Sequence, residues 1–428
     1  ARLERKRHAW SAPVLRSARE QAGGIDSAIW TGKLAGALLG QMYGRNQMDH
    51  EITMSKHWEM WRKSLPVSIQ LPPTDWTDVE VYSSEIRELT TEYEFVRKLN
   101  NKVFDAVALL TKLYDEISSD ELAKLETLRD FPGRGVAGSP VDGAEAAEPG
   151  GVAWALNIVS SRAFDERDQG HYLAPGIDLF NHDYGEAACA RLDAEIGTAL
   201  HDPYHGQVTV VADRDIDAGE EIKFTYNRLP SEVLLIYYGF VPEQNPYDDV
   251  VLFTDLVEAL EFVYGGYLSP GDRQKAISYV LDTASGDISM EGTMIAKKTE
   301  EDFHRLKISN EGVDGRLIQA LQISRVMMDK EESVGELLVK RITQKLRDFS
   351  TTLEQDESEL ASVEAGSRKE AILRLRVSKK RILLMAKMAI QGALQAPKPP
   401  PQGAAKAKSS SKPSAEEEDE DYEEVFLD

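Results

Sequence analysis

The sequence predicts an α+β protein in which a β-rich unit interrupted by helices precedes an all-helical region. Two observations carry this prediction. Apolar residues follow a period of two between residues 172 and 226, most clearly in Gln207–Ala212 and Glu221–Tyr226, and this period is typical of strands. Past about residue 255 the strand signals fade, and the apolar spacing becomes mostly helical up to residue 395.

Composition fits folded domains with terminal extensions. The 428 residues, 42% of them hydrophobic, are enough for two domains with apolar cores. A net charge of -23 argues against direct, sequence-specific nucleic-acid binding, because phosphate contacts need a basic face, and it favours basic partners. The single cysteine, Cys189, excludes an intramolecular disulfide and a multi-cysteine metal site. No apolar run approaches the roughly 20 residues that span a membrane.

Helices are expected in the N-terminal part of the chain. Helical spacing of apolar residues predicts an amphipathic helix over 29–43. A second short helix is expected at 57–61, with its tryptophans in the core. The N-cap signal in Asp75–Asp78 opens a helical region that reaches about residue 116. Residues 131–151 are rich in Gly, Ala and Pro and are expected to form a loop.

The central part alternates between helices and strands. The pattern is helical over Val152–Phe164, and Asp217–Glu220 supplies a turn between the two predicted strands, with a glycine that can adopt positive φ. Ser231 is expected to cap a short helix that runs into Tyr238.

The C-terminal part is expected to contain an antiparallel helical pair, formed by Val334–Leu360 and Arg368–Leu394. After Ala396 the composition becomes Pro-rich, then lysine-rich, then strongly acidic, and such a tail cannot bury enough apolar surface to order itself. The acidic tail and the basic N-terminal arm are therefore predicted to be docking segments for a partner.

Three short stretches are candidates for chemistry, namely Gly176–His182, Phe224–Tyr226 and Tyr238–Phe240. Tyr226 ends a predicted strand at a turn, where a phenol can point into a cleft. A single histidine such as His182, taken alone, is more often a satisfied structural group than a ligand. The chain has no H-x-x-H, H-E-x-x-H or C-x-x-C motif, so no metal site is predicted, and it has no nucleophile elbow and no phosphate-binding loop.

The order of the motifs resembles one known family. Ser161-Arg-Ala-Phe164, then Asp178-Leu-Phe-Asn-His182, then the strand ending in Phe224-Thr-Tyr226, then Glu232–Val241 with Asn245-Pro246, resemble the SET-domain methyltransferases, and more narrowly the Rubisco large-subunit methyltransferase group. The likeness covers about residues 30–395. It implies a SET-type β-rich domain with a helical insertion and crossing strands, followed by an all-helical C-terminal domain.

The resemblance also implies a division of the chain. Residues 1–28 would be an N-terminal arm, and 29–254 a SET-like domain with its helical insertion at 76–151. Residues 255–395 would be a helical domain that binds substrate or a partner, and 396–428 a low-complexity acidic tail.

The activity implied by the resemblance is protein-lysine N-methylation with S-adenosyl-L-methionine as cofactor. Arg162, Asn181 and His182 would then bind the cofactor. Tyr226 would be the catalytic residue beside the transferring methyl group. In-line methyl transfer needs alignment and a desolvated neutral amine, and a phenol favours the polarised methyl without competing as a nucleophile.

Substrate binding would fall to three further residues, Asp178, Tyr238 and Phe240. The two aromatic rings would form the walls of a lysine channel and offer a cation-π contact to the charged amine before it loses its proton. The partner implied is a protein substrate, and the compartment implied is the chloroplast, with cytoplasm or nucleus otherwise.

A second hypothesis remains open on sequence alone. The family begins with a G-x-G strand that wraps the cofactor, and no counterpart occurs upstream of residue 29. A SET-like protein of this kind is a subunit of the plastid-encoded RNA polymerase complex. The alternative is therefore a SET-fold structural subunit of a multisubunit assembly in which catalysis is weak or lost.

Overall fold

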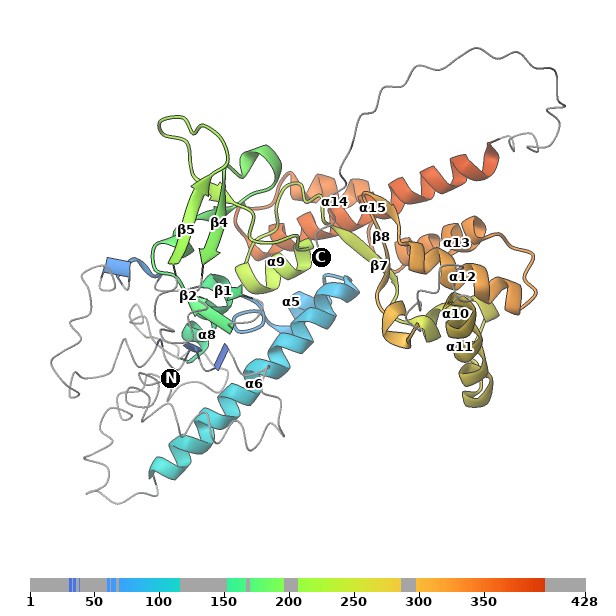
Figure 1. Cartoon of the computed structure of the whole chain (residues 1–428), viewed down its shortest axis with the longest axis horizontal. Coiled ribbons are helices and arrows are strands. Elements are labelled where there is room, and N and C mark those ends of the chain that lie inside the picture. The colour runs from blue at the N-terminus through green and yellow to red at the C-terminus, as the bar shows by residue number, and fades with distance from the viewer. Residues whose placement is uncertain are drawn as a thin grey trace, which may run out of the picture.

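The computed structural model describes residues 31–32, 34–35, 38, 60–61, 63–66, 69–115, 152–166, 170–195, 207–285 and 298–396. The predictions for the N-terminal arm, for the loop at 131–151 and for the tail after Ala396 lie outside these residues. In Figure 1 the first two sheets lie at one side of the molecule, and most of the helices that follow residue 255 lie at the other.

Two segments near the N-terminus are helical where the structure describes them. The described positions between 31 and 38 are helical, as are those between 60 and 64. At those positions this agrees with the helices predicted over 29–43 and near 57–61. Trp61 is 4% exposed, as expected for a core tryptophan.

The helical region predicted after Asp75 is divided into two helices, α5 (Asp78–Tyr82) and α6 (Arg87–Asp115). Thr77 is the N-cap of α5 and takes part in a capping box. Glu85, in the break, has a φ of 62°, a left-handed conformation that cannot continue a right-handed helix. No Gly or Pro marks this break, so the sequence pattern did not reveal it.

Two small sheets follow. Helix α8 (Val152–Arg162) leads into an antiparallel hairpin of β1 (Ala163–Glu166) and β2 (Gly170–Leu173). The second sheet has the order β3-β6-β4-β5, in which β3 is Asn181–His182, β4 is Ala190–Glu195, β5 is Gln207–Ala212 and β6 is Lys223–Phe224. Short 3-10 turns at Ile177–Leu179 and Gly185–Ala187 flank β3.

Strand β6 is parallel to both of its neighbours, β3 and β4. Segments about forty residues apart in the chain therefore lie side by side, as in the crossing that the sequence led us to expect. The strand predicted at Gln207–Ala212 is confirmed as β5. The strand predicted at Glu221–Tyr226 is shorter, because only Lys223 and Phe224 pair with neighbours.

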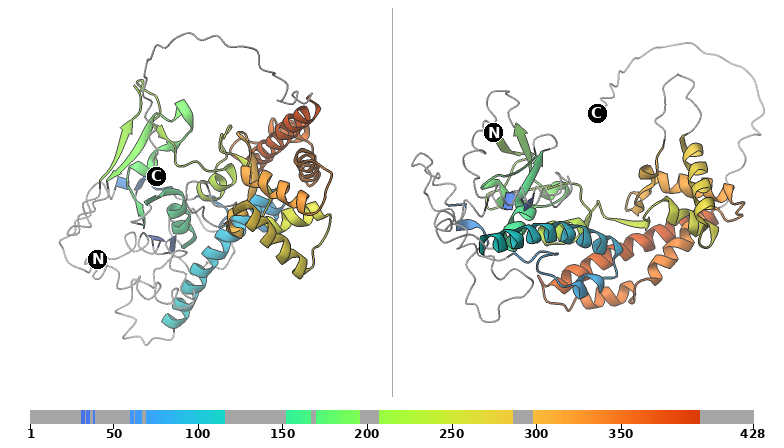
Figure 2. Two further views of the ribbon diagram at one scale, coloured as in Figure 1. Left: turned by 45° about the vertical axis from the view of Figure 1, so that its right-hand side comes forward. Right: turned by 90° about the horizontal axis from the view of Figure 1, so that it is seen from below.

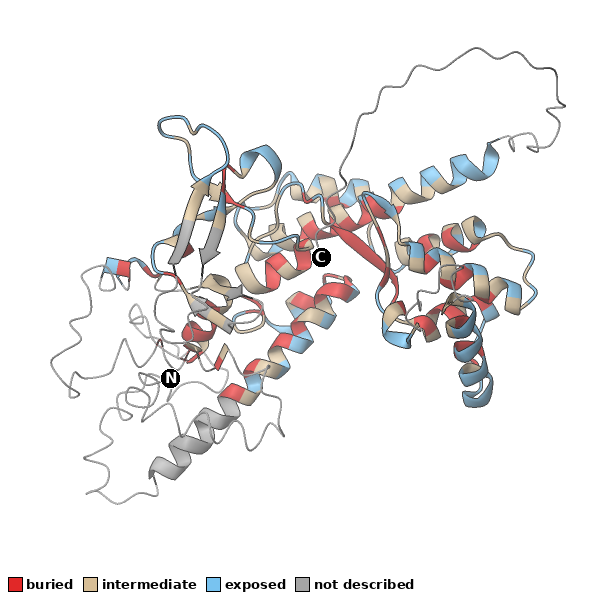
Figure 3. Ribbon diagram, in the orientation of Figure 1, coloured by how far each residue is buried: buried red, intermediate tan, exposed pale blue. Residues whose placement is uncertain are grey.

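Helix α9 (Ser231–Tyr238) is packed on several sides. It contacts α6 and α8, and Figure 3 shows much of it buried. Leu235 and Ile236 belong to one apolar cluster with Leu89 of α6 and Leu375 further along the chain. The short helix predicted to run into Tyr238 is thus confirmed.

A third sheet has two of its three strands in the region past residue 255 that we expected to be all-helical, and that expectation is wrong there. The sheet has the order β7-β8-β9, with β7 at Asp249–Phe253, β8 at Leu306–Ser309 and β9 at Gly312–Val313. All five residues of β7 are buried. A strand buried on both faces shows no alternation, so its pattern is not distinguishable from a helical core segment.

Helices surround this third sheet. They are α10 (Leu256–Tyr264), α11 (Pro270–Ser285) and α12 (Gly315–Met327), with a 3-10 turn at Glu300–Phe303. Their apolar faces and the strands form the largest described core, which includes Phe253, Leu260, Phe303 and Leu321. No helix in the part of the chain described is long and apolar enough to cross a membrane.

The predicted antiparallel pair is present, with one member divided. Val334–Leu360 forms α13 (Val334–Arg347) and α14 (Leu353–Leu360), and both pack on α15 (Arg368–Gln395). Gly335 at the start of α13 lies against Leu394 at the end of α15, which confirms the antiparallel direction. In the two views of Figure 2, α15 extends along the helical side of the molecule.

A buried ion pair joins α15 to α9. Lys379 Nζ donates to Glu232 Oε2 at 2.6 Å and to the carbonyl of Asp249 at 2.5 Å, and both ion-pair side chains are 1% exposed. The Ser378 hydroxyl donates to Asp248 beside this pair. The C-terminal helix is thus bonded directly to the helix that ends in Tyr238.

Candidate active site

The three candidate stretches meet at the end of the second sheet. Pairing of β3 with β6 places His182 opposite Phe224. The backbone N–H of Tyr226 donates to Nδ1 of His182 at 3.0 Å. Tyr238 ends α9, and Gly239 turns the chain so that Phe240 comes back towards His182, at 5.8 Å between ring centroids.

The turn at Gly239 needs a glycine. Its φ of 81° is in the left-handed region, and a Cβ there would lie 2.5 Å from Cδ2 of Leu71. The loop that precedes α5 and the end of α9 therefore approach each other closely. This contact fixes the backbone between the two aromatic residues Tyr238 and Phe240.

Five rings gather at this point, and we call His182, Tyr184, Tyr226, Tyr238 and Phe240 the ring cluster. The centroid of His182 lies 4.2 Å from that of Tyr184 and 5.0 Å from that of Tyr226. The rings of Tyr226 and Tyr238 are 4.9 Å apart. Aromatic faces attract cations within about 6 Å of a ring centroid, so this arrangement suits an ammonium or sulfonium group.

Tyr226 is held as a neutral phenol. Its hydroxyl donates to the carbonyl of Phe180 at 2.7 Å. Burial, with a smaller contribution from Tyr238, raises the pKa of Tyr226 to about 12. Burial also raises the pKa of Tyr238. At neutral pH both phenols keep their protons, so Tyr226 can orient a group by hydrogen bonding but cannot act as a general base.

His182 is held as a neutral imidazole. Burial lowers its pKa more than the nearby Asp183 carboxylate raises it. Because Nδ1 accepts a hydrogen bond from Tyr226, the ring proton is assigned to Nε2. Nε2 is buried and has no hydrogen-bond partner among the described residues.

The buried Asp178 and the half-buried Arg162 support the ring cluster from one side. The Asp178 carboxylate accepts from Nε1 of Trp61 at 2.8 and 2.9 Å and from the backbone N–H of Gly176 at 2.9 Å. Arg162 Nη1 donates to the carbonyl of Asp178 at 2.8 Å and to its carboxylate at 3.2 Å. The side chain of Asp178 is 0% exposed. It therefore fixes the stretch that leads to His182.

Asn181 lies at the edge of this arrangement. Its side chain is exposed and donates to Oε1 of Glu221 at 2.5 Å. The structure thus brings His182, Tyr226, Tyr238 and Phe240 into one cluster, places Arg162 and Asp178 beside it, and leaves the Asn181 side chain outside.

Comparison with known proteins identifies the fold that holds this site. Residues 290–383 match the family model described as Rubisco LSMT substrate-binding. The crystal structure of the SET domain of LSMT bound to lysine and AdoHcy superposes with a TM-score of 0.52 at 16% identity, covering 89% of this chain and 79% of that one. The chain has a SET-type fold.

A curated relative is the chloroplastic [fructose-bisphosphate aldolase]-lysine N-methyltransferase of Arabidopsis thaliana. It is 26% identical over 247 residues, which are 54% of this chain and 48% of the relative. The SET-fold chain thus matches about half the length of that relative.

Reasoning from the sequence missed two members of the SET-fold site. Tyr184 lies two residues after His182 and packs edge-on against it. Trp61 was predicted to lie in the core, but its indole N–H also holds Asp178. The i, i+2 spacing of Tyr184 was the available signal, since such residues share a face of an extended segment. The role of Trp61 had no signal in the sequence, because its partner Asp178 is 117 residues away.

The described ranges contain no group of three or more His, Cys, Asp or Glu side chains that could hold a metal ion. The polar groups of this SET-fold site are a neutral imidazole, a protonated phenol and a guanidinium. Those groups suit an organic cofactor with anionic and hydrogen-bond-accepting parts.

Proposed function

We propose that the chain is an S-adenosylmethionine-dependent protein-lysine N-methyltransferase. The observation that carries this proposal is the ring cluster, in which a neutral His182 and a protonated Tyr226 lie together beside the half-buried Arg162. The SET-type fold, the Rubisco LSMT substrate-binding match and the lysine methyltransferase relative support it.

The residues beside the ring cluster fit this cofactor. Nε of Arg162 and Nε2 of His182 are both buried donors without a partner among the described residues. A buried donor left unpaired costs roughly 1–3 kcal/mol, so both groups favour a ligand that brings acceptors. We propose that Arg162, His182 and Asn181 hold S-adenosylmethionine, partly through the backbone of β3. When bound, this cofactor supplies a methyl group carried on a sulfonium.

In this proposal Tyr226 orients and stabilises the transferring methyl group and does not transfer a proton. Its phenol remains protonated near neutral pH, because burial raises its pKa to about 12. The Tyr226 hydroxyl and the Phe180 carbonyl, 2.7 Å apart, present oxygen dipoles that stabilise a polarised methyl group. The surrounding rings exclude water, and this low-dielectric setting lowers the pKa of a lysine amine so that it enters in its neutral form.

Tyr238 and Phe240 are assigned to the substrate side. Their ring centroids are 6.4 Å apart. Phe240 contacts the ring of His182, and Tyr238 contacts the ring of Tyr226. They would line the path of the lysine side chain. Asp178, which the resemblance assigned to substrate, has its carboxylate engaged inside the protein, so we assign it a positioning role.

The direct test is methyl transfer by the whole chain. Labelled S-adenosylmethionine is incubated with candidate lysine-bearing proteins, and the label is located by peptide mapping. We expect label on lysine side chains, together with cofactor binding measured by calorimetry. Absence of both cofactor binding and labelled lysine would refute the proposal.

A matched pair of variants links any cofactor binding to the site. His182→Ala removes the unpartnered Nε2 donor, whereas His304→Ala removes an exposed histidine in the other half of the molecule. We expect the first variant to weaken cofactor binding and the second to leave it unchanged. Equal affinities for the two variants would contradict the assignment of His182.

A second candidate is a structural subunit of a larger assembly, such as the plastid-encoded RNA polymerase complex. Exposed methionines near the end of α15 favour it, because Met385 is 63% and Met388 is 72% exposed, and such side chains are common at protein interfaces. Substituting both with glutamate should release the chain from such an assembly. Unchanged co-purification would contradict this role. For either function we propose the chloroplast, the compartment of the curated relative.

A further inference from the structure

We propose that a hollow between the segment that follows α9 and the start of α15 binds a basic side chain of the protein substrate, close in sequence to the target lysine. This inference rests on the proposed function and specifies which lysine-bearing sequences the site would select.

The hollow lies directly beside the ring cluster. It encloses about 510 Å³. Its walls are the loop at Gln70 and Trp76, the segment Gly239–Val241 with Glu243, and the start of α15. Phe240 belongs both to these walls and to the ring cluster. A peptide with its lysine between Tyr238 and Phe240 would therefore place a neighbouring residue here.

The arginines at the border of the hollow are already neutralised. Arg368 Nη1 lies 3.0 Å from Oε1 of Glu80, and Arg374 Nη2 lies 2.7 Å from Oε1 of Glu370. Glu243 is exposed and has no ion-pair partner in the described part of the chain. The hollow therefore presents one uncompensated carboxylate.

An uncompensated carboxylate beside apolar walls suits a lysine or arginine side chain. The charged head would pair with Glu243, and the aliphatic stem would lie against Phe240 and Val241. The net charge of the whole chain, -23, also favours the approach of basic peptide segments.

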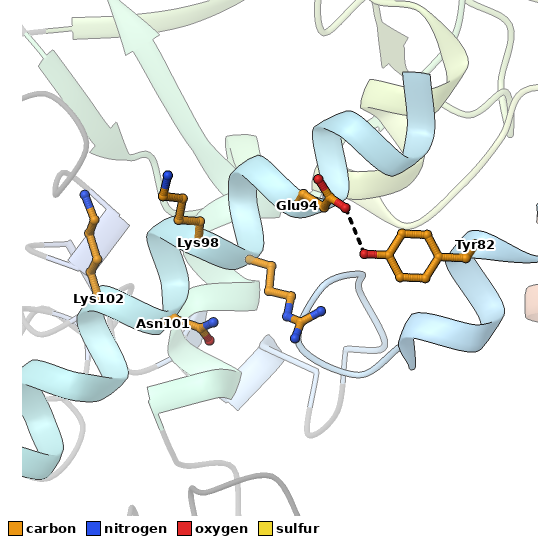
Figure 4. Close-up of a pocket in the computed structure, with 6 residues that line it drawn as sticks. Tyr82, Glu94, Lys98, Asn101 and Lys102 are labelled. Atoms are coloured by element: carbon orange, nitrogen blue, oxygen red, sulfur yellow. Dashed lines mark hydrogen bonds between the residues drawn. The ribbon is translucent and has the colours of Figure 1, made fainter. Parts of the chain in front are cut away.

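The second hollow has the opposite character. It encloses about 460 Å³ on α6, and its walls include Arg97, Lys98 and Lys102. Figure 4 shows Lys98 and Lys102 extending from α6 and the hydrogen bond from Tyr82 to Glu94. None of its residues belongs to the ring cluster, so it is not the neighbour of the proposed lysine channel.

The test measures peptide binding separately from methyl transfer. Fluorescently labelled peptides carry a central lysine and one arginine moved through the neighbouring positions on either side, and the reference peptide carries glutamine instead. Anisotropy titrations use the full chain. We expect at least one arginine position to bind about two- to fivefold more tightly than the reference, the usual effect of one exposed ion pair.

Charge variants of Glu243 decide the assignment. Glu243→Gln should remove the preference for arginine, and Glu243→Lys should reverse it in favour of a peptide with glutamate at that position. Glu311→Gln, an exposed glutamate in the turn between β8 and β9, is the matched control and should keep the preference. Gln70→Trp, at the exposed rim, should block the hollow and reduce the affinity to that of the reference peptide.

Several results would overturn the inference. They are equal binding of all peptides by the wild-type chain, an arginine preference that survives in Glu243→Lys, and no measurable binding of any peptide. Methyl transfer without arginine preference would refute the hollow alone. Arginine preference without methyl transfer would refute the proposed activity and leave the hollow as a peptide site.

Discussion

Replacing Lys379 with methionine should strongly destabilise the protein. Lys379 and Glu232 form a buried ion pair between α15 and α9, and each side chain is 1% exposed. Burial disfavours the charge on Lys379, but the attraction of Glu232 and neighbouring carboxylates outweighs it and raises the pKa of the lysine. Methionine has a similar volume, so the substitution removes the charge while leaving most of the packing.

The magnitude follows from what is left behind. Removing one partner of a buried ion pair costs about 3–5 kcal/mol, because the other charge remains buried and unpaired. Among the described residues, the other cation paired with Glu232 is Arg305, at 3.8 Å and 46% exposed, which compensates little. The carbonyl of Asp249 also loses its Lys379 donor. We therefore expect the free energy of unfolding to fall by about 3–5 kcal/mol.

Urea unfolding followed by circular dichroism measures this change. Lys275→Met is the control, because Lys275 is 84% exposed and its contact with Asp272 is 4.0 Å long, so it should cost under about 1 kcal/mol. The double variant Lys379→Met with Glu232→Leu should recover part of the loss, since no unpaired charge is then buried. A loss below about 1 kcal/mol for Lys379→Met would refute the reasoning.

Three further predictions follow from single sites. Gly239→Ala should lower the free energy of unfolding by about 1–3 kcal/mol because of its left-handed backbone alone, and the contact with Leu71 should lower it further. The variant should also bind cofactor or peptide more weakly. Thermal unfolding and calorimetry measure the two effects, and an unchanged midpoint of thermal unfolding would contradict the prediction. Thr77→Ala should cost about 1 kcal/mol in urea unfolding through loss of the α5 N-cap, and a cost near zero would count against the capping box. Because burial lowers the pKa of His182 below its ordinary 6.5, the unfolded chain binds more protons than the folded one below that pH. Stability should therefore fall as pH drops below about 6.5 and level off below the folded pKa; His182→Gln should lack this component, whereas a fall of the same size in that variant would exclude His182 as its source.

Much of the local structure follows from short-range signals in the sequence. The period of two at Gln207–Ala212 predicts β5, and the turn at Asp217–Glu220 is present with Gly219 at a φ of 90°. The helix leading to Tyr238 and the antiparallel arrangement of α15 are also correct. In these cases one face of the element is buried and the other is exposed, so apolar residues recur at a regular spacing in the sequence.

The elements that escaped prediction lack such a trace. β7 is buried along its whole length and shows no alternation. The break at Glu85 depends on a positive φ, which a glutamate in the sequence does not indicate. Both features are set by tertiary packing rather than by local preference.

Part of the site was predicted from the order of its motifs, and part of it was missed. The residues His182, Tyr226, Tyr238 and Phe240 occur in an order that a family resemblance could supply, and the structure brings their rings together. The support of Asp178 by Trp61 depends on a contact over 117 residues, which no periodicity encodes.

The central claim is that the ring cluster transfers a methyl group to lysine with Tyr226 in position beside it. The most direct measurement is the rate of lysine methylation by the wild-type chain and by Tyr226→Phe, with mass spectrometry of the modified peptide. The account predicts that removing the hydroxyl, which bonds Phe180 at 2.7 Å, lowers the rate by about 10²–10³ while the fold is retained. Equal rates for the two proteins would contradict it.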